Sequence, residues 1–193
     1  MAQGTRERLV TAANDLFFSD GFHAVGLDAI LARAGVTKTT FYNHFASKDD
    51  LIIAVLQERD RIEFGEWMEL MAARGGTDPR ARILALFDIL EEWLADPDYK
   101  GCMFLKAQAE FPAPNDPVHK AALVHGRNLF EALREQARAA GCEQPDALAG
   151  QLMIVLSGAI LTRTNTGMVD RARSARATAG VLVEHHLGRL VST

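Results

Sequence analysis

The amino-acid sequence predicts an all-α protein of about nine helices. Apolar residues recur every three or four positions through most of the chain, as they do on the buried face of a helix. No segment alternates apolar and polar residues for long enough to indicate a strand. The clearest break is Gly75-Gly76-Thr77-Asp78-Pro79, and all the prolines lie at or after it. We therefore expect an N-terminal domain over residues 1–47, a long connecting helix over 48–73 and a C-terminal helical domain over 74–193.

Composition indicates an ordinary soluble protein. With 193 residues, 48% of them hydrophobic, the chain can build one sizeable core or two small ones. Cys102 and Cys142 are too few and too far apart for a disulfide framework or a zinc site, so a reducing cytoplasm is expected. The longest apolar stretch, 152–161, is short for a membrane span and contains Ser157 and Gly158. We expect a cytoplasmic protein that does not enter a membrane.

The first predicted helix covers residues 5–19. Its apolar residues share one face, which would brace the segment that follows. Gly21 and Phe22 end the helix, with the Phe22 ring at the junction with the next helices. The apolar positions are Leu9, Ala12, Ala13, Leu16 and Phe17.

Residues 27–50, LDAILARAGVTKTTFYNHFASKDD, predict two helices joined by a tight turn. Gly35 supplies the left-handed residue that ends the first helix, and Val36 enters the core between the two. Thr37 is a favourable N-cap for the second helix.

The second helix of the pair is short and has two different faces. Phe41 and Phe45 are four residues apart, so they point inward together. Threonine and asparagine can bond base edges in a major groove, while lysine, tyrosine and the helix N-terminus can hold phosphates. This composition predicts a helix-turn-helix that reads double-stranded DNA. The outward residues are Lys38, Thr39, Tyr42, Asn43 and His44.

The charge balance by itself does not indicate a nucleic-acid partner. The net charge is −4, and residues 1–50 hold five Lys and Arg against six Asp and Glu. Asp49 and Asp50 can cap the next helix, and Asp15 and Asp20 precede the motif, so the groove-facing surface need not be acidic. We expect binding through a few phosphate contacts, weakened by salt.

The run GVTKTTFYNHFASKDDL, residues 35–51, resembles the signature of the TetR family of transcriptional regulators. The resemblance covers roughly residues 5–55. It implies an all-helical homodimer whose helix-turn-helix binds operator DNA and whose C-terminal part binds a small molecule that releases it. Val25 and Gly26 stand where many members have Thr or Ser, and Leu31 stands where Ala is usual. The residues expected at the DNA are Gly26, Thr37, Lys38, Thr39, Thr40, Tyr42, Asn43, His44 and Lys48.

The rest of the chain reads as a series of helices. Ser47 and Asp50 form a capping box that opens the long connecting helix. The later helices are expected from Pro79 to Asp96, from Tyr99 to Phe111, from Pro117 to Gly141, from Asp146 to about Thr166, and from Asp170 to about Leu190.

The last two predicted helices carry many small residues on their faces. Small residues let two helix backbones approach closely, so these faces suit a dimer interface. Packing within the same chain is the alternative, and spacing alone does not separate the two. The family resemblance favours the dimer, because two half-sites need a two-fold partner. The positions counted in these faces are Ala147, Gln151, Ser157, Gly158, Ala159, Thr162, Ala172, Ala175, Ala179 and Gly180.

Other candidate sites are weaker. Cys102 lies between apolar residues, where inert packing is more common than a redox-sensing thiol. His119 and His125, with Glu110 nearby, are six residues apart and would not share a helix face, so no metal and no cofactor is expected. His185 and His186 are expected at an interface or on the surface.

The C-terminal domain should hold the effector pocket implied by the resemblance. Apolar and aromatic side chains would suit an apolar or amphipathic molecule, although for any single one of them ordinary core is the better-supported alternative. The candidate walls are Trp67, Met71, Phe87, Trp93, Met103, Phe104, Phe130 and Met153.

These observations favour a homodimeric, ligand-responsive repressor that binds operator DNA. We find no nucleophile with a plausible base, no glycine-rich phosphate loop and no metal-ligand cluster, so an enzyme is not expected. One alternative is a helical small-molecule carrier or enzyme whose N-terminal motif is only structural. A second is a DNA-organising protein without sequence preference.

Overall fold

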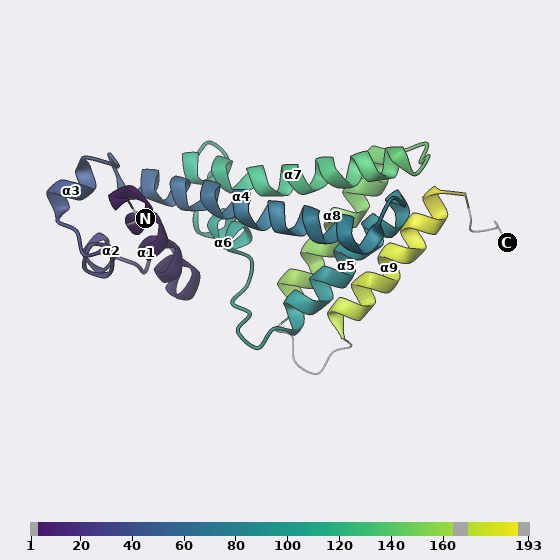
Figure 1. The fold of residues 1–193 in the computed structure, drawn as a ribbon, viewed down its shortest axis with the longest axis horizontal. Coiled ribbons are helices and arrows are strands. Elements are labelled where there is room, and N and C mark those ends of the chain that lie inside the picture. Colours follow the sequence, from purple (N-terminus) through teal and green to yellow (C-terminus); the bar gives the residue numbers. More distant parts are fainter. Residues whose placement is uncertain (1–3, 164–169, 189–193) are drawn as a thin grey trace. The chain divides into compact units, whose positions relative to one another are not determined.

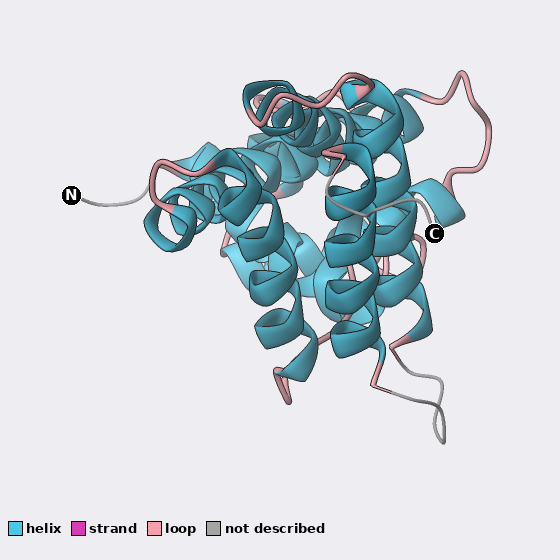
Figure 2. Ribbon diagram, turned by 90° about the vertical axis from the view of Figure 1, so that its right-hand side faces the viewer, coloured by secondary structure: helices cyan, strands magenta, loops and turns pink. Residues whose placement is uncertain are grey.

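The computed structural model of the chain describes residues 4–163 and 170–188. Within these ranges the regular structure is entirely helical, which confirms the predicted all-α class (Figure 2). The helices are α1 (Thr5–Asp20), α2 (Leu27–Ala34), α3 (Lys38–Tyr42), α4 (Lys48–Gly75), α5 (Pro79–Ala95), α6 (Met103–Glu110), α7 (Pro117–Ala139), α8 (Pro145–Thr162) and α9 (Arg171–His186) (Figure 1).

The chain divides into two compact units. We call the first the N-terminal unit, which comprises residues 1–62 and 102–125. The second, the C-terminal unit, comprises residues 63–101 and 126–193. Helix α6 and the start of α7 therefore pack with the N-terminal helices, although they follow α5 in the sequence.

Local side chains fix where several helices begin. The Asp78 carboxylate accepts a hydrogen bond from the Arg80 N–H, and Pro79 occupies the first turn of α5, where a missing N–H costs nothing. The Asp170 carboxylate accepts from the Arg173 N–H at the start of α9. These caps satisfy N–H groups that the first turn of a helix leaves without partners.

The core of the N-terminal unit is aromatic. The Phe17 and Phe22 rings lie 5.2 Å apart, and the Phe111 ring, which directly follows α6, meets Phe22 edge-on at 6.0 Å. Phe41 of α3 and Phe104 of α6 are also buried in this cluster. Burial of such large rings dominates the stability of a small helical unit.

The C-terminal unit is built on α5, α8 and α9, which lie side by side in Figure 1. Helix α9 packs along both of the others. Ion pairs at its edge join α9 to α5, Arg176 Nε to Asp88 Oδ1 at 2.5 Å and Arg80 to Glu184. The predicted faces of small residues are thus partly used within the chain, since Ala172, Ala175 and Ala179 are buried.

One helix boundary differs from the sequence expectation, and two others cannot be compared with it. Helix α6 begins at Met103 and not at Tyr99, because Gly101 has a φ of 94°, which no helical residue adopts. The expected ends of α8 near residue 166 and of α9 near residue 190 lie outside the described residues.

Helix α8 is apolar along its length, with a mean hydropathy of 1.4 over Pro145–Thr162. Among the described residues it is a helix that by length and composition could cross a membrane, so the expectation that no stretch reaches that length is wrong for α8. Core and interface helices of soluble proteins meet the same criterion, and 33% of α8 is buried within the chain.

Candidate nucleic-acid interface

Helices α2 and α3 are joined by a turn that the backbone closes tightly. Gly35 has φ 65° and ψ 41°, the left-handed conformation predicted for it, and the Val36 N–H reaches back to Leu31 O at 3.1 Å. Gly26 precedes α2 in an extended conformation and, having no side chain, gives no side-chain cap. The turn fixes the direction in which α3 leaves α2.

Helix α3 is held at its start by two threonines. The Thr37 hydroxyl accepts from the Thr40 N–H at 3.2 Å, as predicted for an N-cap, and the Thr37 and Thr40 hydroxyls lie 2.8 Å apart. Both hydroxyls are therefore engaged with each other inside the cap. Their expected role at the DNA stays a prediction, and it would have to use their remaining hydrogen-bonding capacity.

Two phenylalanines anchor α3 to the core. Phe41 and Phe45 are both buried, and their rings lie 5.8 Å apart in a stacked arrangement. Tyr42 lies beside Phe41, edge-on at 5.2 Å, but its side chain is 52% exposed. Residues 38–45 thus combine two buried aromatic rings with exposed polar side chains.

Helix α3 and the two residues that follow it carry the predicted set of polar residues. Each of these side chains is solvent-accessible, and together they provide amide, hydroxyl, imidazole and ammonium groups that can bond base edges and phosphates. They are Lys38, Thr39, Tyr42, Asn43 and His44. All five are exposed, Lys38, Thr39 and Tyr42 within α3 and Asn43 and His44 directly after it; their contact with DNA stays a prediction.

Lys48 lies at the start of α4 and has a partner within the protein. Its Nζ donates to Phe22 O at 2.6 Å and lies 5.9 Å above the Phe17 ring. A phosphate contact would therefore need another of the three N–H donors of this ammonium group. The Ser47 hydroxyl accepts from the Asp50 N–H at 3.1 Å, which is one half of the predicted capping box.

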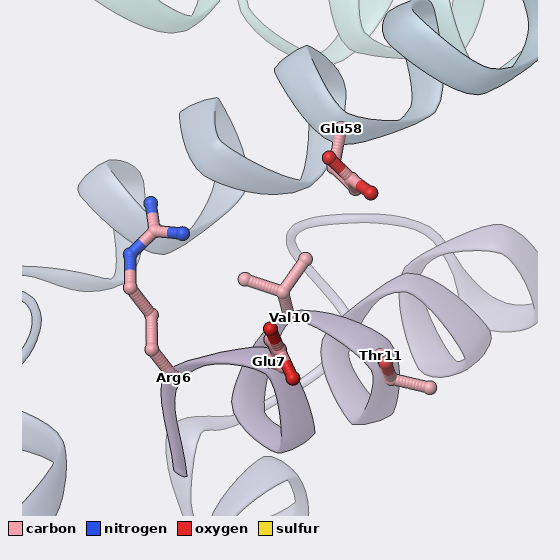
Figure 3. A pocket seen from close by; sticks show the side chains of 5 residues that line it. All are labelled: Arg6, Glu7, Val10, Thr11 and Glu58. Carbon is pink, nitrogen blue, oxygen red and sulfur yellow. The ribbon is translucent and has the colours of Figure 1, made fainter. Parts of the chain in front are cut away.

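Arg6, near the start of α1, is a cation beside the helix-turn-helix. Little in the sequence points to a role for it. Its guanidinium lies 5.3 Å from the centre of the Phe45 ring. It also lines a cavity of about 300 Å³ with Glu7, Val10, Thr11 and Glu58 (Figure 3). The Glu58 carboxylate is bonded by Arg61, and this hydrogen bond lowers its pKa.

The predicted effector-pocket residues fall into two groups. Six of them belong to the core of the C-terminal unit or pack against it, namely Trp67, Met71, Phe87, Trp93, Phe130 and Met153. The other two, Met103 and Phe104, are buried in the core of the N-terminal unit. Trp67 and Trp93 meet edge-on with ring centroids 5.8 Å apart. None of the eight lines the cavity of Figure 3.

The histidines considered as metal ligands have other partners. His119 Nδ1 lies 2.8 Å from Phe111 O, and His125 Nδ1 lies 2.8 Å from Asp60 Oδ1. His186 Nε2 bonds Gln151 at 2.9 Å. Among the residues that the structure describes, no group of three or more His, Cys, Asp or Glu is arranged to hold a metal ion.

Comparisons with known proteins identify both halves of the chain. Residues 9–55 match the family model described as bacterial regulatory proteins, tetR family. Residues 79–179 match the model described as tetracyclin repressor-like, C-terminal domain. The chain belongs to the TetR family. The first match contains the whole α2–α3 motif, so the family assignment and the exposed polar face of α3 concern the same residues.

Individual TetR relatives support this assignment over different lengths. The transcriptional repressor NemR of Escherichia coli is 30% identical over 72% of this chain and 69% of its own length. The transcriptional activator FasR of Mycolicibacterium smegmatis is 42% identical, but over only 45% of this chain and 40% of its own length. The crystal structure of SCO4454, a TetR-family regulator from Streptomyces coelicolor, has a TM-score of 0.82 at 29% identity and covers 95% of this chain and 96% of that one.

Proposed function

We propose that the chain is a DNA-binding transcriptional regulator that acts as a homodimer in the cytoplasm. The observation that carries this proposal is the segment of residues 38–45, which contains α3: Phe41 and Phe45 are buried, and the polar residues around them are exposed. An exposed face of that kind on the second helix of a helix-turn-helix is what major-groove recognition needs. Membership of the TetR family supports the same function.

The test is a gel shift with the purified protein and a labelled fragment from upstream of its own gene, with random DNA as competitor. Specific binding that survives the competitor supports a regulator. Equal loss of the shift to random and cognate competitor would mean a DNA-organising protein without sequence preference. No shift on any promoter fragment, together with tight binding of a small molecule, would favour a carrier or enzyme in which the motif is only structural.

We propose that the dimer forms through α8 and α9. Ile154 and Leu161 on α8 are 74% and 66% exposed, and Val181 on α9 is 59% exposed. Ile154 and Leu161 are seven residues apart, so they lie on one face of α8, together with the exposed Ala147 and Gly158. Large apolar side chains this exposed, aligned on one helix face, are typical of an interaction surface, and a second copy of the same helix pair would cover them.

We propose that an apolar or amphipathic small molecule controls DNA binding. The aromatic cluster around Trp67 and Trp93 in the C-terminal unit supports such an effector by its chemistry. The effector would bind more tightly to a conformer in which the two α3 helices of the dimer do not fit the operator. Operator affinity would then fall by the ratio of the effector's affinities for the two conformers. Loss of the gel shift on adding the molecule, with recovery on its removal, is the expected behaviour.

We propose repression as the outcome at the promoter, as in NemR, whereas FasR is an activator. Transcription from the same fragment in vitro separates the two: a repressor lowers transcript yield when it binds, and an activator raises it. No catalytic activity is assigned to the chain.

A further inference from the structure

The last residue of α6 bonds the turn between α1 and α2. Glu110 Oε1 accepts a hydrogen bond from the Phe22 N–H at 3.1 Å, and Glu110 Oε2 accepts one from the His23 N–H at 2.7 Å. One carboxylate thus holds two consecutive backbone N–H groups, 88 and 87 residues away in the sequence. We call this arrangement, Glu110 with the N–H groups of Phe22 and His23, the Glu110 clamp.

Further contacts join the same two segments. His23 Nε2 lies 2.9 Å from Glu110 O, and the His23 ring lies 4.7 Å from the Phe111 ring. One turn earlier on α6, Lys106 Nζ donates to Phe18 O near the end of α1 at 3.2 Å. The chain approaches so closely at Gly21 that a Cβ there would lie 2.9 Å from Glu110 Oε1. All of these residues belong to the N-terminal unit.

The position of Glu110 is not explained by the stability of α6. A negative charge on the last residue of a helix lies at the negative end of the helix dipole, where it is unfavourable. The two charge-assisted hydrogen bonds to the turn compensate for this position. The carboxylate therefore stabilises the turn and not its own helix.

The clamped turn determines where α2 and α3 lie. The Phe22 N–H is held by Glu110, and the Phe22 carbonyl accepts from Lys48 of α4 at 2.6 Å, so charged side chains hold both ends of this residue. Its ring is fully buried. Helix α2 begins at Leu27, five residues after Phe22, and leads through Gly35 to α3. A displacement of the turn would move the exposed face of α3 with it.

We propose that Glu110 is a positioning residue for operator binding, which it supports by holding the α1–α2 turn and thereby α3 in place. This inference rests on the proposed function of the chain as a DNA-binding regulator. Glu110 itself is an acidic group, so it is not expected to bind DNA phosphates; it acts through the turn.

The test uses Glu110→Gln, which keeps the size of the side chain but replaces one acceptor oxygen by a donor NH2 group. Removing a negative charge from a DNA-binding unit strengthens binding to a polyanion when only long-range electrostatics matters. The clamp predicts the opposite, a loss of operator affinity of about tenfold, because a hydrogen bond to a charged acceptor is worth at least that factor. The control is Asp20→Asn, which removes the same charge next to Gly21 at an exposed carboxylate.

Two readouts accompany the affinity measured by gel shift in full-length protein. Amide exchange at Phe22 and His23 should speed up in Glu110→Gln and stay unchanged in Asp20→Asn. The dependence of affinity on salt should keep its slope, because no phosphate contact is lost. Glu110→Asp, which keeps the charge but shortens the reach, serves as a second variant if the glutamine does not fold, with the same expected loss.

The outcomes separate the two proposals. Affinity in Glu110→Gln that equals or exceeds that of the wild type would overturn the positioning role, as would weaker binding with unchanged exchange at Phe22 and His23. If the wild-type protein shows no specific shift, the proposed function fails and the positioning role fails with it, while faster exchange in Glu110→Gln would show separately that the clamp itself exists.

Discussion

His125 Nδ1 of α7 lies 2.8 Å from Asp60 Oδ1 of α4, inside the N-terminal unit. The two side chains are only 13% and 15% exposed, and the His125 ring stacks on Phe104 with ring centroids 4.0 Å apart. Burial lowers the pKa of His125 below its ordinary value; the hydrogen bond to Asp60 opposes this effect, and the positive charge of Arg59 adds to it. A neutral His125 donates its Nδ1 proton to the Asp60 carboxylate.

The first prediction is that acid destabilises the protein through this histidine. Below about pH 6.5, the ordinary histidine pKa, unfolded His125 binds a proton that the folded protein takes up only at lower pH. The unfolded state then binds more protons, so the free energy of unfolding falls as the pH drops through this window. The free energy of unfolding, measured by urea denaturation, should fall less between about pH 7.5 and pH 5.5 in His125→Asn than in the wild type. An equal fall in both would assign the effect to other histidines.

The second prediction concerns the cap of α3. Thr37→Ala removes the acceptor for the Thr40 N–H, so it should reduce the free energy of unfolding by about 1 kcal/mol. Thr37→Ser keeps the hydroxyl and should stay close to the wild type. Urea denaturation measures both variants. If alanine and serine are equally stable, the Thr37 hydroxyl is not the group that holds the start of α3.

The third prediction distinguishes phosphate contacts from base contacts in the α3 region. Tyr42→Phe, which removes only an exposed hydroxyl, should weaken binding to all DNA sequences alike if that hydroxyl holds a phosphate. Asn43→Ala should instead change which bases are preferred, at a cost of about 1–3 kcal/mol for the preferred site. Selection of binding sites from a random library with each variant distinguishes these effects. Unchanged affinity and unchanged preference in both variants would mean that α3 does not face the DNA as proposed.

The fourth prediction tests the dimer surface. Ile154→Glu places a charge in the middle of the exposed apolar face of α8 and should yield a monomer, because an unpaired charge at an interface is costly to bury. Val124→Glu on α7 makes the same type of change at a 41% exposed apolar residue and should leave the oligomeric state unchanged. Sedimentation velocity measures both. A dimeric Ile154→Glu variant would place the subunit contact elsewhere.

The helix-turn-helix of α2 and α3 could be predicted from the sequence because it depends on local contacts. The residues that shape this motif contact neighbours only a few positions away, so their spacing in the sequence predicts the turn, the cap and the buried rings. They are Gly35, Thr37, Phe41 and Phe45. The family resemblance in residues 35–51 drew on the same signals, and the family models confirm it.

Contacts between distant segments were not predictable. The sequence around Glu110 shows only nearby histidines, and nothing in it points to a turn 88 residues earlier. Lys48 was expected to face phosphate, whereas its Nζ donates to Phe22 O, another distant partner. The spacing of the small residues in the last two helices does not show which of them pack within the chain. Ala179 is buried in its own chain, whereas Gly158 is exposed.

Helix α3 is five residues long, and the positions that secure it are different from the positions that face outward. Lys38, Thr39, Asn43 and His44 can therefore be exchanged with little effect on folding, while Phe41 and Phe45 cannot. If these residues bind the bases as proposed, a duplicated copy of the protein can acquire a new target sequence by a few substitutions without losing its structure. If α3 binds the base edges as proposed, the same separation makes it a practical place to change the target sequence by design.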